Sequence, residues 1–557
     1  MSAPQVTTPD GVRWTIAPDA TNLVADDALP TDTLALQRWL ESGQADIVKT
    51  GPHRTVYRVR LPQMIVYWKR CRLLGIRGWL RQLLRPPKAR MEFDRAQALR
   101  AKQIPTIEPI AWGTRHRLWP SESMLITRNC DGTHALREIL EEQLPRLSGP
   151  EQAALRRMIA CELGIFLAKL HQAGIVHPDL HPGNFLVKLP ANGVPIFYLL
   201  DLHAIRMTGP LDWQSARANL VLFHRYFQLR ASRADRARFW RSYRGHRSDW
   251  PQDPPLARQQ ALELETATAE SNHRFWRSRK ARCTGKNRYF QPIRSRIAHG
   301  FAVRDLDAAF LRTFAADPDA PFRDASNRVL KSGGASTVIE MMLPTPQGNR
   351  PVILKRFNMP HLVDGLKNLL RPSPALRSWI AGNALLDRGL PTARPLVMLH
   401  RRRFGLPTVG YLLCEKVADA VELPDAIPTR DPHTLRRRID RLGQLLACMH
   451  DRQLAHRDLK AANLLMDSQE QFWFIDLVGM ECDIAPSTER RLRDLTRLAV
   501  SFASDPRIRN TDRLRFLRAY FAWGLHGSAG WKSTWRTLAD AVARKIDRNR
   551  KRGRVIA

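Results

Sequence analysis

Two short runs of the chain combine a histidine, an aspartate and an asparagine at one fixed spacing. Residues 177–184 read HPDLHPGN and residues 456–463 read HRDLKAAN, so both follow the pattern H-x-D-L-x-x-x-N. The aspartate of such a run is suited to accept or orient the proton of a substrate hydroxyl, and the asparagine five residues later to hold a magnesium ion. These residues are Asp179 and Asn184 in the first run and Asp458 and Asn463 in the second. The two runs therefore predict a phosphoryl-transfer unit that occurs twice.

The sequence around the two runs repeats as well. The offset of 279 residues that relates the runs also aligns residues 163–171 with residues 442–450, both apolar at helical spacing. Further upstream, an offset of 286 residues aligns Lys69 with Lys355. Self-similarity over so long a period indicates duplicated domains, because solenoid repeats span only about 20–50 residues.

The first unit contains a candidate for each part of a phosphotransfer site. Lys69 ends a predicted strand, where it can contact the α- and β-phosphates of a nucleotide. Glu92 begins the next predicted helix and can form the ion pair that positions this lysine. Asp201 follows a second apolar strand and offers, with the asparagine of the run, the oxygen atoms that a hard cation prefers.

The second unit repeats this set with one departure. Lys355 and Asp476 each end an apolar stretch, as their counterparts do, and Gly333 and Gly334 form a turn whose backbone amides can cradle phosphate. The offset of 286 residues places Ser378 opposite the glutamate of the first unit. Without a carboxylate there, we expect the second unit to be either an atypical enzyme or a degenerate, supporting copy.

These features predict an α+β fold of two tandem protein-kinase-like domains, each with a small β-rich lobe and a helical lobe. At 557 residues the chain is too long for a single hydrophobic core. We expect a loosely packed lead-in over residues 1–35 and a first domain over residues 36–300, with a basic helical extension. A second domain with a basic tail is expected over residues 310–557.

The chain has a large excess of positive charge. It contains 89 Lys and Arg against 53 Asp and Glu, a net charge of +36, which indicates a polyanionic partner or simply an arginine-rich composition. Residues 69–90 contain eight basic residues and no acidic one, and their leucines fall at helical spacing beside an arginine stripe. This pattern is typical of a helix on an anionic membrane, although its apolar stripe could instead pack on its own domain. We favour the membrane and expect no nucleic acid.

Cysteine usage and apolar runs bear on the compartment. The seven cysteines are scattered without a C-x-x-C pattern, which favours reduced thiols over a zinc site or a disulfide framework. We find no signal-peptide pattern, and no apolar run approaches the roughly 18 residues that span a bilayer. We therefore expect a cytoplasmic protein that is soluble or peripheral on a membrane. The sequence predicts no oligomeric state.

The motifs resemble those of one known family, the lipopolysaccharide kinases of the Kdo/WaaP type. The run at 177–184 looks like the catalytic loop of that family, and Glu92 followed by the Ile-Pro-Thr turn at 104–106 looks like its acidic helix start and turn. The basic stretch after Lys69 is also similar. The resemblance covers most of residues 40–225 and 325–500 and is stronger in the first unit.

This resemblance implies a kinase that uses ATP and Mg²⁺ to phosphorylate a heptose or Kdo sugar of the lipopolysaccharide inner core. The implied partners are the lipopolysaccharide core or a lipid A precursor and the anionic surface of the inner membrane. The chain reads Asp-Leu-His at 201–203 and Asp-Leu-Val at 476–478, where eukaryotic-type protein kinases have Asp-Phe-Gly, and it lacks an Ala-Pro-Glu motif. A peptide-binding activation segment is therefore unsupported, which favours a small-molecule or glycolipid acceptor.

Two alternatives remain open at the level of sequence. The first is a Ser/Thr protein kinase, favoured by Lys460, which follows Asp458 by two residues as in that class. The second is a tandem pseudokinase scaffold at the membrane, against which the complete Asp, Asn and Asp sets argue.

Overall fold

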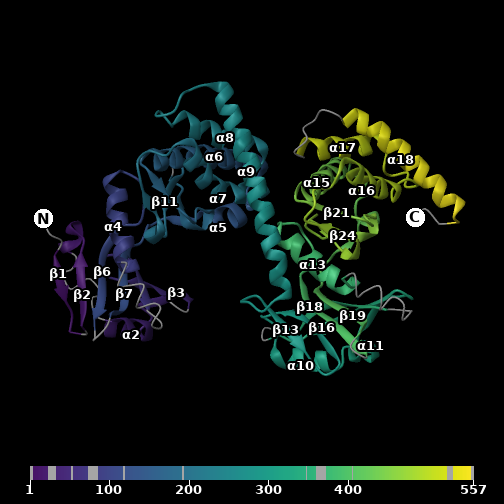
Figure 1. Cartoon of the computed structure of the whole chain (residues 1–557), viewed down its shortest axis with the longest axis horizontal. Helices are drawn as coiled ribbons and strands as arrows, with labels where there is room; N and C mark the ends of the chain where they lie inside the picture. Colours follow the sequence, from purple (N-terminus) through teal and green to yellow (C-terminus); the bar gives the residue numbers. More distant parts are fainter. Residues whose placement is uncertain are drawn as a thin grey trace. The chain divides into compact units, whose positions relative to one another are not determined.

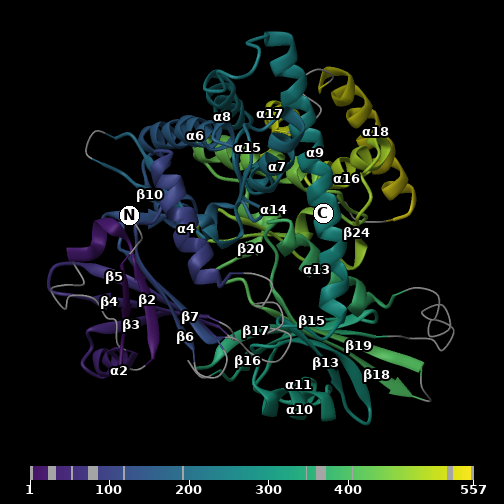
Figure 2. The same ribbon diagram turned by 60° about the vertical axis from the view of Figure 1, so that its left-hand side comes forward.

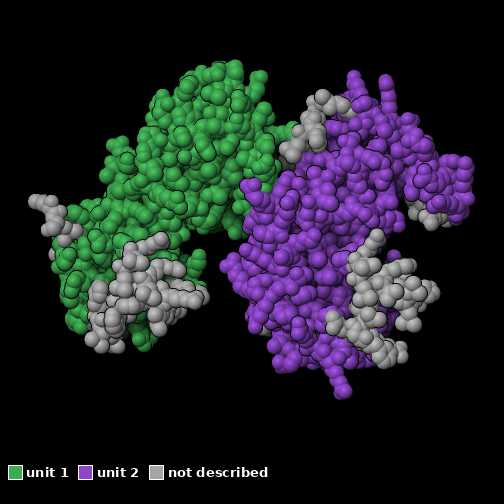
Figure 3. All heavy atoms as spheres, viewed as in Figure 1, with its two compact units in different colours: residues 1–271 green, residues 272–557 purple. Residues whose placement is uncertain are grey.

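The structure is a computed structural model of the chain (Figure 1). It divides into two compact units, residues 1–271 and residues 272–557, which Figure 3 distinguishes by colour. Both units combine helices with β-sheets, as the sequence predicts. The described residues are 4–9, 11–22, 33–51, 54–72, 86–116, 120–190, 193–345, 348–358, 372–403, 406–523 and 531–553.

A seven-stranded antiparallel sheet forms one part of the first unit (Figure 2). In spatial order its strands are β1 (Gln5–Thr7), β2 (Val12–Ile16), β6 (Pro109–His116), β7 (Pro120–Arg128), β5 (Ile65–Arg72), β4 (Arg54–Arg60) and β3 (Ala45–Gly51). Helix α2 (Thr33–Glu41) precedes β3, and helix α4 (Lys88–Ala101) packs against β6 and β7. On β5 the buried Val66 and Trp68 alternate with more exposed residues, so Lys69 points to the face opposite Trp68.

The helical part of the first unit follows this sheet along the chain. Its helices are α5 (Leu136–Glu138), α6 (Gly149–Gln172), α7 (Trp213–Arg230), α8 (Arg233–Gly245) and α9 (Pro254–Lys280), and the division between the units falls inside α9. Its short strands are β8 (Thr133–Ala135), β10 (Phe185–Lys188) and β11 (Ile196–Leu199) in one sheet, and β9 (Ile175–Val176) with β12 (Arg206–Met207) in another. The run 177–184 therefore lies between β9 and β10.

The second unit repeats this architecture. Its seven-stranded sheet has the order β13 (Phe290–Arg294), β14 (Ala298–Val303), β18 (Pro395–Arg403), β19 (Leu406–Glu415), β17 (Arg350–Phe357), β16 (Ser336–Leu343) and β15 (Arg328–Ser332). Its short strands are β20 (Val421–Glu422), β22 (Leu464–Met466) and β23 (Phe472–Phe474) in one sheet, and β21 (Leu454–His456) with β24 (Met480–Cys482) in another. Its helices are α10 (Ala308–Ala316), α11 (Ala320–Arg323), α13 (Pro374–Asp387), α14 (Leu423–Ala426), α15 (Pro432–Asp451), α16 (Thr488–Val500), α17 (Asn510–Trp523) and α18 (Trp531–Lys551).

Each sheet begins with a hairpin that the sequence analysis placed wrongly. In the first unit, Val12, Trp14 and Ile16 are buried and β2 pairs with β6, so this part of residues 1–35 is not a loosely packed lead-in. In the second unit, β14 pairs with β18, so residues 290–303 belong to the second sheet and do not extend the first domain. In both cases the pairing partner lies about 100 residues away in the sequence, which local patterns do not reveal.

Two parts of the chain bear on contact with a membrane, the predicted basic helix and the described helices. The predicted basic amphipathic helix lies almost wholly in residues 73–85, outside the described part of the chain. Among the helices that are described, none combines the length and the apolar content that a membrane span requires.

Gly164 of α6 allows close packing against α8. A Cβ at this position would lie 2.5 Å from the carbonyl oxygen of Phe239, and Gly443 of α15 faces Phe516 of α17 in the same way, at 2.7 Å. Both contacts involve backbone, which cannot rotate away. The glycines within the two aligned stretches therefore fix the helix spacing in each unit.

We expect Gly164→Ala to lower the free energy of unfolding of the first unit by about 1–3 kcal/mol, because the added methyl group overlaps the α8 backbone. Gly149→Ala is the matched control on the same helix, since its Cβ would meet no atom within 4 Å. Urea denaturation of the two variants and the parent gives the comparison. Equal midpoints for Gly164→Ala and Gly149→Ala would contradict the close contact.

Candidate functional site

The loop that carries Asp179 is held by its own histidine. His177 is fully buried; its Nδ1 accepts a hydrogen bond from the backbone N–H of Asp179 at 3.2 Å, and its Nε2 donates to the carbonyl oxygen of Leu200 at 3.1 Å. Burial lowers the pKa of His177, which keeps the imidazole neutral and its Nδ1 free to accept. The Asp179 side chain itself is 73% exposed, so its carboxylate is accessible to a substrate hydroxyl. His181 lies beside it, with Nε2 3.6 Å from the Asp179 Oδ2.

A buried hydrogen-bonded chain supports this loop from behind. Asn219 of α7 donates to the carbonyl oxygen of His177 at 2.6 Å and accepts from the His177 N–H at 3.3 Å. Its Oδ1 also lies 3.2 Å from Nε2 of His171, whose Nδ1 lies 2.9 Å from the Tyr243 hydroxyl. Arg247, which has no exposed side-chain surface, donates to that hydroxyl at 2.9 Å. None of these residues was assigned to the site from the sequence, because His171, Asn219 and Tyr243 read locally as ordinary polar positions of helices and Arg247 lies just after α8.

The side-chain amide of the asparagine in the first run is held by the run itself. Asn184 is buried, and its Nδ2 donates to the carbonyl oxygen of Asp179 at 2.7 Å. This bond fixes the amide and leaves Oδ1 as the free ligand atom. The carbonyl oxygen of Asn184 also accepts from the N–H of Leu200 at 2.8 Å, which brings Asp201 next to the run. The donor set is therefore an amide oxygen and a carboxylate, which fits the preference of Mg²⁺ for oxygen.

Lys69 and Glu92 form a shielded ion pair. Lys69 Nζ lies 2.5 Å from Glu92 Oε1, and the two side chains are 13% and 6% exposed. Because an unpaired charge at such a depth is unfavourable, each residue needs the other. The structure thus joins the lysine of β5 to the glutamate of α4, as the sequence analysis expected.

Asp201 stands at the end of β11 in a left-handed backbone conformation, with φ of 58°. Its carboxylate lies 2.9 Å from His203 Nδ1 and 3.4 Å from the Arg54 guanidinium. The hydrogen bond from His203 lowers the pKa of Asp201 most, and the charges of His203, Arg54 and Lys69 lower it further, against the opposing effect of burial. Asp201 is therefore an ionised oxygen donor throughout the physiological pH range. The sequence analysis missed Arg54 and His203.

The turn after α4 braces the strand that leads to Asp201. Thr106 is buried, and its hydroxyl donates to the carbonyl oxygen of Leu199 at 2.7 Å; in the second unit the Thr392 hydroxyl donates to Phe474 at the same distance. The repeated Pro-Thr turn was visible in the sequence, but its partner was not. The hydrogen bond of the turn fixes the end of the strand that precedes the aspartate, Asp201 in the first unit and Asp476 in the second.

In the second unit the loop is built in the same way. His456 is buried, its Nδ1 accepts from the N–H of Asp458 at 3.1 Å, and Asn463 Nδ2 donates to the Asp458 carbonyl oxygen at 2.7 Å. The residue that bonds the His456 N–H is Asp494, at 2.8 Å, where the first unit has an asparagine. Lys460 lies 3.1 Å from the Asp458 carboxylate.

The lysine of the second unit has a different partner. Lys355 Nζ lies 2.7 Å from Asp476 Oδ1, so it pairs with the candidate metal ligand itself. Ser378 occupies the expected place on α13; it is 2% exposed, and its Oγ has no hydrogen-bond partner within the described chain. Asp476 also has a positive φ, 52°, as its counterpart does. The second unit therefore has Ser378 of α13 in place of the glutamate, and its lysine pairs with Asp476 instead.

Gly333 and Gly334 lie in the turn between β15 and β16. The N–H of Gly333 donates to the carbonyl oxygen of Ser336 at 3.1 Å, and the Asn358 side chain donates to the carbonyl oxygen of Gly333 at 3.3 Å. The turn is thus held by hydrogen bonds of its own. Phosphate binding by its amides stays a prediction.

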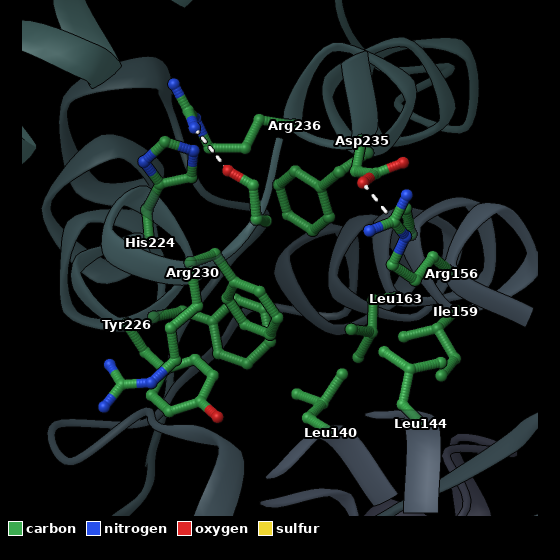
Figure 4. A pocket seen from close by; sticks show the side chains of 15 residues that line it. Leu140, Leu144, Arg156, Ile159, Leu163, His224, Tyr226, Arg230, Asp235 and Arg236 are labelled. Atoms are coloured by element: carbon green, nitrogen blue, oxygen red, sulfur yellow. Dashed lines mark hydrogen bonds and ion pairs between the residues drawn. The ribbon is translucent and has the colours of Figure 1, made fainter. Parts of the chain in front are cut away.

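An apolar cavity lies apart from these residues (Figure 4). It has a volume of 180 Å³ between α6, α7 and α8, and the ion pair of Arg156 with Asp235 lies at its edge. A corresponding cavity of 330 Å³ in the second unit includes Asp512 and is walled on one side by α18. Because neither cavity includes a residue of the two runs, we place the chemistry at the loops and not here.

Comparisons with known proteins agree with the motifs. The model of the lipopolysaccharide kinase (Kdo/WaaP) family matches residues 65–243 and 366–520, together more than half of the chain. A protein named 3-deoxy-D-manno-octulosonic acid kinase from Xylella fastidiosa (strain M12) is 32% identical over 147 residues, which are 25% of this chain and 56% of that protein. The protein of the same name from Vibrio cholerae is 34% identical over 126 residues, 22% of this chain and 50% of the relative. The chain thus spans about half the length of these curated relatives.

A similar solved structure is titled "WaaP in complex with acyl carrier protein". It is 18% identical, has a TM-score of 0.33, and the match covers 46% of this chain and 99% of that chain.

The buried histidines make stability depend on pH. Burial lowers the pKa of both His171 and His224 to about 4, against 6.5 in an unfolded chain. Between these values the unfolded state binds protons that the folded state excludes. The contribution of these histidines to stability is therefore fully present above pH 6.5. As the pH falls from 6.5 toward 4, each histidine lowers the free energy of unfolding by about 1.4 kcal/mol per pH unit.

We expect His224→Leu to reduce the slope of the free energy of unfolding against pH by the contribution of one histidine. Urea denaturation from pH 7.5 to pH 4.5 measures this slope. His134→Gln is the control, because His134 is 51% exposed. A slope that His224→Leu leaves unchanged would show that folding does not lower the pKa of His224.

Proposed function

The chain belongs to the lipopolysaccharide kinase (Kdo/WaaP) family, and we propose that its first unit transfers the γ-phosphoryl group of ATP to a sugar hydroxyl of the lipopolysaccharide inner core. Each unit is, in this proposal, a protein-kinase-like domain whose sheet and helices form two lobes. The acceptor is a Kdo or heptose residue, and the names of the similar proteins favour Kdo.

One observation carries the proposal. The first unit holds a shielded lysine and glutamate pair, an exposed aspartate, and two oxygen donors that are tied together through Leu200. Phosphoryl transfer needs these parts to bind the nucleotide, neutralise charge and aim the acceptor. Among the described residues of the second unit, the same set lacks its glutamate.

In this mechanism each side chain has one task. Asp179 orients the acceptor hydroxyl and receives its proton, while the His177 bond to the Asp179 N–H keeps the carboxylate in position. Lys69, oriented by Glu92, contacts the α- and β-phosphates. Asn184 Oδ1 and the Asp201 carboxylate hold the metal. Mg²⁺ supplies charge neutralisation on the transferred group when it is bound with ATP.

The second unit supports the first in this proposal. Lys355 is held by Asp476, so nucleotide and metal would both have to compete with an existing ion pair. We propose that this unit turns over slowly or not at all and serves as a structural copy.

The substrate accounts for the proposed location. Inner-core sugars are attached to a lipid anchor, so the enzyme has to work at a membrane surface. We propose peripheral binding at the cytoplasmic face of the inner membrane, supported by the net charge of +36, which favours an anionic lipid surface.

We expect cells that carry Asp179→Ala to lose one phosphate from their core oligosaccharide, as measured by mass spectrometry. Purified protein should lose activity on a Kdo-containing lipid A precursor by about 10²–10⁴-fold, because proton transfer from the acceptor is unassisted. Asp458→Ala should retain the phosphate. Asp547→Ala is the control, since this aspartate of α18 is 63% exposed.

Other results would redirect the assignment. Loss of phosphate only in Asp458→Ala would make the second unit the active one. An unchanged core in both variants, with phosphate transfer to protein, would favour a Ser/Thr protein kinase. Failure of the intact chain to bind Mg-ATP at all would favour the tandem pseudokinase scaffold.

A further inference from the structure

Arg54 faces the candidate metal ligand of the first unit. It is the first residue of β4, and its Nη1 lies 3.4 Å from Asp201 Oδ1. The Nε of Arg54 is buried and has no hydrogen-bond partner within the described chain. The guanidinium thus contacts the site through one long bond and has donors that the described residues do not use.

This arginine is specific to the first unit. In the β4–β5 ladder, Val56 pairs with Lys69; in the β16–β17 ladder, Val338 pairs with Lys355. The same register therefore places Ser336 where the first unit has Arg54. The positive charge that the first unit adds beside its aspartate is absent at this position in the second.

The ion pair of Arg54 with Asp201 is not needed to hold the fold. Its side chains are 36% and 31% exposed, and a pair this long and this accessible contributes little to the stability of the fold. His203 already bonds the same carboxylate at 2.9 Å. A cation that binds Asp201 repels the guanidinium, which then requires another anion nearby.

We propose that Arg54 is a phosphate-binding residue of the first unit, and that it exchanges Asp201 for the terminal phosphate of the nucleotide when a divalent cation occupies the carboxylate. This rests on the proposed function, because it requires a nucleoside triphosphate at the site. A guanidinium suits the task, since its planar fork can donate two parallel hydrogen bonds to phosphate oxygens. Lys69 then contacts the inner phosphates and Arg54 the outer one.

The test is nucleotide binding, measured by titration calorimetry with Mg²⁺ on the full chain. An Asp476→Ala background removes the candidate metal ligand of the second unit and so weakens nucleotide binding there. We expect Arg54→Ser, which introduces the residue of the second unit, to weaken binding of a non-hydrolysable ATP analogue roughly 10- to 100-fold, the value of a charge-assisted contact. Binding of ADP, which lacks the terminal phosphate, should change less than about threefold.

Arg58→Ser is the matched control. Arg58 lies on the same strand, is 42% exposed and pairs with Asp46, away from the site. Its loss should leave both affinities unchanged. Arg54→Lys keeps the charge but loses the planar guanidinium, so its affinity for the ATP analogue should lie between those of the parent and of Arg54→Ser. It also replaces Arg54→Ser in the test if that variant does not fold.

If Arg54→Ser weakens binding of the ATP analogue and of ADP equally, the proposal is overturned, because Arg54 would then act only through Asp201. Unchanged affinity for both would overturn it as well. If the background protein binds neither nucleotide in the first unit, the proposed function itself fails, and this result is distinct from a failure of Arg54 alone.

Discussion

The hydrogen bonds of one buried imidazole hold the whole site of the first unit together. His177 accepts from the loop that carries Asp179 and donates to Leu200, the residue before Asp201. Two segments from different parts of the chain, one with Asp179 and one with Asp201, are therefore joined through this ring. It works only while the ring is neutral, because a protonated Nδ1 cannot accept, and burial secures that state. The spacing between Asp179 and Asp201 follows from this group together with Asn184, which bonds the backbone of both segments.

The two units differ mainly in how they distribute charge around the second aspartate. In the first unit Lys69 pairs with Glu92, and Asp201 instead contacts Arg54 and His203. Among the described residues of the second unit no glutamate pairs with Lys355, and a largely buried ammonium needs a counter-ion. Asp476 fills that need. The residue at one position of the helix beside the sheet, Glu92 or Ser378, thus goes with a change in whether the aspartate is paired with the lysine.

The sequence predicted the parts that depend on short spacing. The two loops, the two lysines and the two aspartates each stand within a few residues of a strand or run that marks them. The hairpins of β1 with β2 and of β13 with β14 were not predicted, because they are completed by strands about 100 residues away. Asn219 and Asp494 were missed because a polar residue in a helix usually faces solvent. Their common offset of 275 residues, which Asp201 and Asp476 share, was the available signal.

That change of offset, from 279 to 275, has a structural reason. At the base of the hairpin after each loop, Phe185 pairs with Leu199 and Leu464 pairs with Phe474, so the second hairpin is four residues shorter. Each strand of the second hairpin is one residue shorter, and the segment that joins the strands is two residues shorter, so the shortening lies at the far end of the hairpin. Leu199 and Phe474 are both buried accordingly. Because the pair at the base is kept in both hairpins, Asp476 follows Phe474 by two residues as Asp201 follows Leu199, and a change of length at the far end leaves the position of the aspartate relative to the loop unchanged.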